Sequence, residues 1–336
     1  MKKAIVIFMA LANIAICKGQ SLRPEIDSLI SKIASKNNLS SNWSGIFLEE
    51  SDQRKAYFTL RENATDAELI QLTKHENPNV RCYAFESLTY RENVDFTNII
   101  IDHLYDTASV NHVIGCMVAT KSVIDYFIEM LTSEDIDEHA YKLSNNEKNI
   151  IDSILIFGQN INLNAKDLLL LSISPRKDYY ERIREIVVNE NNISGLIALA
   201  KYKNQQDVEL ILDKLKSTKR DDKFHALWAV RYFPDSSFFQ HLKEINSKDL
   251  KKTYNAALIR MFYQALVQYK DSASIELIQS NLKEMEDRLL EIHSQFIWLA
   301  IEKYPAPMYI DIKNEIRLSE NQRSDIEYWL RNIDKQ

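Results

Sequence analysis

The sequence predicts an all-α protein built as an α-solenoid, a superhelix of antiparallel helix pairs. The 336 residues include only five glycines and six prolines, whereas a turn-rich β protein needs many more of both. In the C-terminal half, helical apolar patterns alternate between one apolar side and two. The first helix of each pair starts near Asp207, Asp235, Ser272 and Pro305, and these spacings of 28, 37 and 33 residues are typical of helix-pair repeats.

Outer and inner helices of these pairs differ in how many of their sides are apolar. The outer helix over residues 208–215 has a single apolar stripe, made by Val208, Ile211, Leu212 and Leu215. The helix over residues 224–233 carries two stripes, so we expect it to be buried on two sides. The same alternation recurs in two later pairs, residues 235–245 with 254–269 and residues 274–285 with 289–304.

Residues 75–88 form the stretch with the clearest helix signals. Pro78 fixes φ at the value that a first helical residue needs, and Asn77 or Asn79 can cap the helix. A buried stripe then recurs every four residues, at Val80, Ala84 and Leu88. This Pro-x-Val-Arg-x-x-Ala-x-x-x-Leu run resembles the second helix of a HEAT-type repeat.

The chain therefore looks like a HEAT-like repeat protein over residues 64–336. The resemblance implies a right-handed superhelix, and it implies a binding scaffold, the commonest role of such folds. It also implies that Arg81 bonds to the turn of a neighbouring repeat. Residues 20–63 begin with an amphipathic helix and continue through a polar stretch, and we expect them to form an irregular N-terminal cap of the array.

Further helix starts are predicted by capping boxes at Thr65–Glu68, Ser144–Glu147 and Ser319–Gln322. The last of these opens a helix that should close the array. The stretch from Val110 to Lys121 is expected to be a helix that pairs with residues 94–105.

Residues 1–19 are expected to form a signal peptide. Two lysines precede an apolar run over residues 4–16 that is too short to span a membrane as a stable helix, and small residues follow before Gln20. We therefore expect an exported protein, periplasmic or secreted, with no transmembrane segment in the mature chain. A lipid anchor on Cys17 is the less favoured alternative, because Ile16 stands where such sites need Gly, Ala or Ser.

Removal of residues 1–19 would leave 39 basic and 48 acidic residues, a net charge of −9. Such a field repels nucleic acid, so we expect no nucleic-acid partner. Against this background, two basic clusters lie in equivalent turns about one repeat apart and would form a basic ridge: Lys214, Lys216, Lys219 and Arg220, then Lys243, Lys248, Lys251 and Lys252. The ridge is a candidate surface for an acidic partner, and the alternative is a solvated turn neutralised by Asp221, Asp222 and Asp249.

No motif for catalysis, a cofactor or a metal ion is found in the sequence. Two loose metal-like groupings are interpreted as ordinary surface residues: His103 and His112 with Asp102 or Asp106, and Asp135, Asp137, Glu138 and His139. Aromatic residues at helical spacing are interpreted as packing residues: Trp228, Tyr254, Phe296 and Trp298. Cys82 and Cys116 are interpreted as small buried helix residues, with a disulfide between them as the alternative.

These observations favour an extracytoplasmic, non-catalytic scaffold that binds a protein or an anionic envelope polymer along its inner helices. The alternative is a hydrolase-like enzyme whose active site is assembled from several repeats and leaves no local motif. A deep pocket with converging carboxylates or histidines would favour the enzyme.

Overall fold

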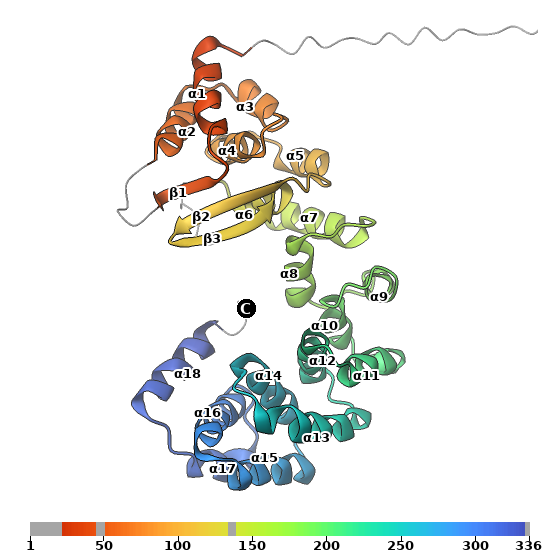
Figure 1. The fold of residues 1–336 in the computed structure, drawn as a ribbon. Helices are drawn as coiled ribbons and strands as arrows, with labels where there is room; N and C mark the ends of the chain where they lie inside the picture. The colour runs from red at the N-terminus through yellow and green to blue at the C-terminus, as the bar shows by residue number, and fades with distance from the viewer. Residues whose placement is uncertain (1–21, 45–50, 134–138, 333–336) are drawn as a thin grey trace, which may run out of the picture. The chain divides into compact units, whose positions relative to one another are not determined.

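The structure is a computed structural model that describes residues 22–44, 51–133 and 139–332, and these residues are mostly helical (Figure 1). They form 18 α-helices and three short strands, so the predicted helical class is confirmed. The proposed signal peptide lies outside the described residues, as do Asp135, Asp137 and Glu138. In the described part of the chain, no helix combines the length and the apolar character needed to cross a membrane.

The chain divides into two compact units, residues 1–144 and 145–336. The boundary that the sequence suggested between residues 63 and 64 falls inside the first unit. There α2 (Asp52–Asn63), placed by the sequence in an irregular cap, packs directly against α4 (Pro78–Leu88). The remaining helices of this unit are α1 (Pro24–Ala34), α3 (Asp66–Leu72), α5 (Phe96–His103) and α6 (Val123–Thr132).

Helix α4 is central to the first unit. It packs against α1, α2, α3 and α6, and nine of its eleven residues are buried. Pro78 opens the helix, and the Asn77 side chain accepts hydrogen bonds from the backbone nitrogens of Asn79 and Val80, at 2.9 and 3.3 Å. The start of this helix, predicted from Asn77 and Pro78, is thus confirmed.

The helix predicted over Val110–Lys121 is wrong. These residues form an antiparallel hairpin of β2 (Ser109–Gly115) and β3 (Met117–Ser122), and β1 (Leu39–Ser44) pairs in parallel with β2. The apolar residues recur three and four apart, but most are β-branched, which favours a strand. Gly115 costs stability inside a helix and suits the short connection between Ile114 and Met117, which pair across the hairpin.

The second unit consists of helices joined by short turns. In chain order they are α7 (Asn145–Phe157), α8 (Asn164–Ser172), α9 (Tyr180–Val188), α10 (Gly195–Ala200), α11 (Val208–Lys216), α12 (Arg220–Tyr232), α13 (Phe239–Lys248), α14 (Ala256–Leu266), α15 (Ser272–Glu284), α16 (Asp287–Lys303), α17 (Ile310–Glu315) and α18 (Glu320–Asn332). Helices α10, α12, α14 and α16 pack on one another in succession, and we call them the inner helices. Helices α9, α11 and α15 each pack against the inner helix that follows them (Figure 1).

Turns before the outer helices share a common construction. Asn204, Asp235 and Asp271 cap the segments that follow, each by accepting a backbone hydrogen bond. Two of these turns also contain a tyrosine whose hydroxyl donates a hydrogen bond to the turn before the preceding outer helix. The Tyr202 hydroxyl donates to the Arg176 carbonyl at 2.7 Å, and the Tyr269 hydroxyl donates to the Asp235 carbonyl at 2.9 Å. The predicted starts of the outer helices are confirmed.

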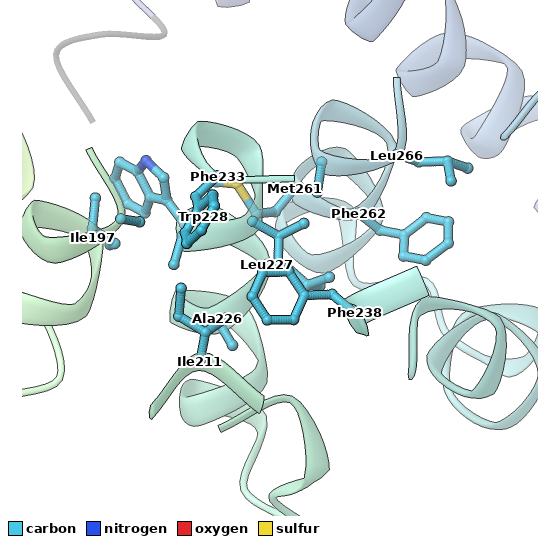
Figure 2. Close-up of a cluster of buried hydrophobic side chains, with 14 of the residues drawn as sticks. Ile197, Ile211, Ala226, Leu227, Trp228, Phe233, Phe238, Met261, Phe262 and Leu266 are labelled. Carbon is cyan, nitrogen blue, oxygen red and sulfur yellow. The ribbon is translucent and has the colours of Figure 1, made fainter. Parts of the chain in front are cut away.

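The core of the second unit lies between the inner and outer helices. Figure 2 shows Leu227 directed toward Phe238, and Trp228 on the same helix directed toward Ile197. Helix α12 is therefore buried on two sides, as its two apolar stripes predict. Trp228 and Phe296 are buried and Trp298 packs against the core, but Tyr254 is 60% exposed, so its interpretation as a packing residue is wrong.

Both cysteines of the described residues are free. Cys82 is buried in α4, as interpreted from the sequence. Cys116 is exposed in the connection between β2 and β3, so its interpretation as a buried helix residue is wrong. The error follows from the wrong helix over residues 110–121.

Candidate binding site on the inner helices

A cluster of cationic, aromatic and amide side chains lies on the inner helices of the second unit. We call it the inner-helix cluster, and its members are Trp228, Arg231 and Tyr232 of α12, Arg260 and Gln264 of α14, and Trp329 of α18. Residues three or four apart share one side of a helix, which is why each helix contributes its members together. The packing of α12 on α14 then brings the two sets into contact.

Arg231 is at the centre of the cluster. Its Nη1 donates to Gln264 Oε1 and its Nη2 donates to the Tyr232 hydroxyl, both at 2.9 Å. The guanidinium carbon lies 5.2 Å from the centre of the Trp228 ring and 4.8 Å from that of Tyr232, within range for cation–π attraction. The Arg260 guanidinium carbon lies 4.1 Å from the centre of the Trp329 ring.

Four buried N–H groups of the cluster have no hydrogen-bond acceptor in the part of the chain that the structure describes. They are Trp228 Nε1, Arg231 Nε, Arg260 Nη1 and Gln264 Nε2. Arg231 is 6% exposed and Gln264 is fully buried. Nearly all buried polar atoms in proteins have a partner, and a buried donor without one costs about 1–3 kcal/mol. The four groups here are all donors, and all belong to one cluster.

No carboxylate balances the charge of the cluster, because neither Arg231 nor Arg260 forms an ion pair with any described residue. Burial, and secondly the charge of Arg231, lower the pKa of Arg260. The same two causes lower the pKa of Lys201, which follows α10, to about 8. Arg231 therefore lies close enough to Arg260 and to Lys201 to disfavour the charged form of each.

Lys201 differs from the two arginines because backbone carbonyl groups of the protein accept hydrogen bonds from its ammonium group. Its Nζ donates to the carbonyl oxygens of Leu171 and Ile173, at 2.8 and 2.9 Å. These carbonyls lie at the C-terminal end of α8, the negative end of the helix dipole. Lys201 is thus a structural link between α8 and α10, and the unmatched donors belong to α12 and α14.

Seven residues of the basic ridge lie at the end of α11, at the start of α12, at the end of α13 and in the turn after α13. Lys243 lies in the middle of α13, so its predicted place in the turn is wrong. Three of the ridge residues form ion pairs: Lys214 with Asp213 at 3.1 Å, Lys248 with Glu244 at 3.4 Å and Lys251 with Glu284 at 2.7 Å. Lys243 lies over the Phe239 ring, whereas Lys216, Lys219, Arg220 and Lys252 are exposed. Asp249 forms an ion pair with Lys223, which is outside the ridge, at 2.6 Å.

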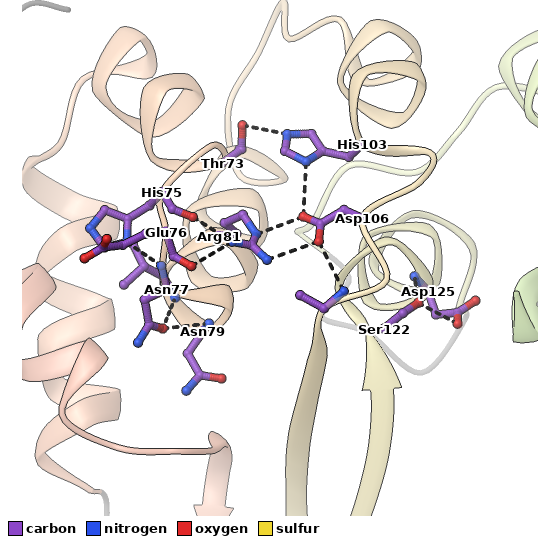
Figure 3. Close-up of polar contacts among 12 residues, drawn as sticks. Thr73, His75, Glu76, Asn77, Asn79, Arg81, His103, Asp106, Ser122 and Asp125 are labelled. Carbon is purple, nitrogen blue, oxygen red and sulfur yellow. Dashed lines mark hydrogen bonds and ion pairs between the residues drawn. The ribbon is translucent and has the colours of Figure 1, made fainter.

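Two members of the metal-like grouping, His103 and Asp106, belong to a structural network in the first unit (Figure 3). Asp106 receives both Arg81 Nε, at 2.8 Å, and Arg81 Nη2, at 3.1 Å. His103 is buried between Asp106 and the Thr73 hydroxyl, so the interpretation of His103 as a surface residue is wrong. Among the described residues, no three His, Cys, Asp or Glu side chains come together as a metal site.

Arg81 also bonds to the turn before its own helix. Its Nη1 donates to the carbonyl oxygens of His75 and Glu76, at 2.7 and 3.0 Å (Figure 3). Since Asp106 follows α5, Arg81 bonds to the turn of the next helix as well, as the sequence resemblance implied. The role of Arg81 is to tie two turns together.

Comparison with protein-family models, with curated proteins and with solved structures finds no match to this chain. The inner-helix cluster was not singled out in the sequence, because Arg231 and Arg260 are distant along the chain. The one available signal was a charged residue inside a helix that is otherwise apolar on two sides, as Arg231 is.

Proposed function

We propose that this protein is a binding scaffold, in which the helix pairs of residues 145–336 form a right-handed HEAT-like solenoid that presents its inner helices to a partner. The succession of α10, α12, α14 and α16 supports this proposal, and so do the similar turns with their capping residues. The apolar run over residues 4–16 supports export, so the partner would be met outside the cytoplasm.

The observation that carries the proposal is the set of unmatched donors around Arg231 and Arg260. A purely structural cluster would be expected to pair these buried groups with acceptors, since leaving them unpaired destabilises the fold. A partner that supplies a negative charge would satisfy them. The partner class is therefore an acidic protein or an anionic envelope polymer.

The basic ridge is a second candidate surface for the same kind of partner. Its motivation is the repetition of cations in equivalent turns, with Lys216, Lys219, Arg220 and Lys252 exposed. Ion pairs within the protein already neutralise part of the ridge, and exposed charges are screened by salt. We therefore place the ridge second to the inner-helix cluster.

Capture of partners from an envelope extract, across a salt series, tests the function and separates the two surfaces. The baits are the parent protein, Arg260→Gln, and a ridge variant with Lys214, Lys216, Lys219 and Arg220 changed to Glu. We expect the parent to retain a specific partner, Arg260→Gln to lose it, and the ridge variant to keep it. If only the ridge variant fails to capture the partner, the partner binds the ridge and not the inner-helix cluster. If the parent protein captures no partner at any salt concentration, the scaffold proposal is refuted.

The enzyme alternative has a direct measurement of its own. A pocket that joins several carboxylates or histidines is what such an activity requires. Incubation of the purified protein with envelope polymers and with generic ester and peptide substrates would detect hydrolysis. Turnover that survives repurification, and is lost in an inner-helix variant, would contradict the scaffold as the primary function.

A further inference from the structure

Resting on the proposed function, we infer that the inner-helix cluster binds a carboxylate, and that the carboxylate is an Asp or Glu side chain of an acidic peptide segment. The inference names the chemistry of the partner, which the proposed function leaves open between a protein and a polymer. Three features of the cluster support it.

The first feature is the number and kind of unmatched groups. Four buried N–H donors face no acceptor, and Gln264 offers its nitrogen because its oxygen is already bound to Arg231. A carboxylate has two oxygens that accept about four hydrogen bonds, and it has no hydrogen to donate. Guanidinium groups are the side chains best suited to hold such a planar anion. The donor set therefore matches a carboxylate in sign, since all four groups donate and none accepts.

The second feature is the charge and burial of the cluster. Arg231 is almost fully buried and Arg260 is partly buried, and neither has a carboxylate partner among the described residues. An entering anion must lose much of its water, and that cost rises steeply with its charge. A phosphate monoester carries about −1.5 to −2 at neutral pH, whereas a carboxylate carries −1. The buried site therefore favours the monoanion.

The third feature is the set of rings around the two guanidinium groups. Trp228 and Tyr232 lie against Arg231, and Trp329 lies against Arg260. Tryptophan and tyrosine bury large apolar areas at protein interfaces, and each can donate one hydrogen bond. They are suited to the apolar residues that flank an acidic side chain in a peptide. Tyr232, Arg260 and Trp329 are the partly exposed members of the cluster, so we expect the carboxylate to approach from their side.

Peptide titration of the purified protein tests the inference. The probes are one blocked peptide, acetyl-Gly-Phe-Glu-Phe-Gly-amide, and the same peptide with Gln or phosphoserine in place of Glu. Binding is measured by calorimetry and by tryptophan fluorescence, to which Trp228 and Trp329 contribute together with the two other tryptophans of the chain. We expect saturable binding of the Glu peptide, with the Gln peptide about tenfold weaker or more, since a charged hydrogen-bond partner is lost.

Variants then locate the site. Arg260→Gln and Gln264→Leu should each weaken binding of the Glu peptide about tenfold. Lys283→Gln is the matched control, because it removes one exposed positive charge that belongs neither to the cluster nor to the basic ridge. Circular dichroism shows whether each variant is folded. If Gln264→Leu does not fold, the result for Arg260→Gln, which alters a partly exposed residue, decides the question. Equal binding of the Glu and Gln peptides, tighter binding of the phosphoserine peptide, or an equal loss in Lys283→Gln would overturn the inference.

These results separate the inference from the function on which it rests. Capture of a partner that depends on Arg260, without peptide binding, would keep the scaffold and refute the carboxylate. Peptide binding that depends on Arg260, without any captured partner, would keep the carboxylate site and refute the scaffold.

Discussion

Arg231 donates a hydrogen bond to the Gln264 side-chain oxygen at 2.9 Å, and this bond joins two neighbouring inner helices across the centre of the cationic cluster. The bond fixes the orientation of the Gln264 amide, because it occupies the oxygen and leaves the nitrogen without an acceptor. A contact that stabilises α12 on α14 thus also creates an unmatched donor.

Removal of the Arg260 charge should leave the free protein as stable or make it more stable. Arg260 is partly buried, has an unmatched Nη1 and lies near the positive charge of Arg231. We expect Arg260→Met, which keeps an apolar stem against Trp329, to raise the free energy of unfolding by up to about 1 kcal/mol. Urea unfolding measures the change, with Lys216→Met as a control of no effect. A loss of more than about 1 kcal/mol would show that Arg260 is structural.

The buried Asn246–Asn281 pair should behave as a coupled unit. Each amide nitrogen donates to the oxygen of the other, at 2.9 and 2.7 Å, and both side chains are almost fully buried. Asn246→Leu alone leaves the amide of Asn281 partly unsatisfied, at a cost of about 1–3 kcal/mol. We expect the double variant with Asn281→Leu to lose less than the sum of the two single variants. Unfolding of all four proteins gives the coupling energy, and strict additivity would contradict the pairing.

The stability of the second unit should fall with acid because of His293. Burial, which outweighs the opposing effect of the Leu250 backbone, lowers the pKa of His293 from 6.5 to about 4. The Tyr263 hydroxyl accepts from Asn281 and lies 2.7 Å from His293 Nδ1. In the neutral tautomer with its proton on Nε2, Nδ1 accepts the hydrogen bond of the Tyr263 hydroxyl. Protonation of Nδ1 would remove that acceptor.

The sign of the effect follows from the two pKa values of His293. The unfolded chain takes up its proton near pH 6.5 and the folded protein only near pH 4, so stability is complete above pH 6.5 and is lost as the pH falls toward 4. His293→Gln should lack this part of the pH dependence. Unfolding midpoints of parent and variant at pH 7, 5.5 and 4.5 give the comparison, and parallel curves would show that His293 does not titrate in this range.

Arg81→Lys should destabilise the first unit although the charge is kept. Arg81 binds Asp106 through two nitrogens and also donates to two backbone carbonyls, and a lysine cannot reproduce this fork. We expect a loss of about 1–3 kcal/mol, whereas removal of Lys74 from its exposed pair with Asp102 should cost less than about 1 kcal/mol. Thermal unfolding of Arg81→Lys beside Lys74→Ala measures the two costs. A similar loss in both variants would contradict the special role of the Arg81 fork.

Local signals in the sequence were enough to predict most of the helices. Asn77 with Pro78 predicted the start of α4, and the capping box at Thr65 predicted the start of α3. These features could be recognised because they act within a single turn of backbone. Two apolar stripes on residues 224–233 likewise predicted a helix buried on two sides. The same periodicity failed at Val110–Lys121, where a spacing compatible with a helix belongs to a hairpin that pairs with distant Leu39 and Ser40.

By itself the sequence determined where helices begin, which of their sides are buried, and that basic residues recur in equivalent turns, since each of these depends on residues close together in the chain. Only the tertiary structure decided that α12 packs on α14 and so brings Arg231 to Gln264 and near Arg260. It also decided that neither arginine forms an ion pair with a described carboxylate. Hydrogen bonding and burial act over a few ångströms, whereas the chain separates these residues by a full repeat, so their shared site exists only once the helices have packed.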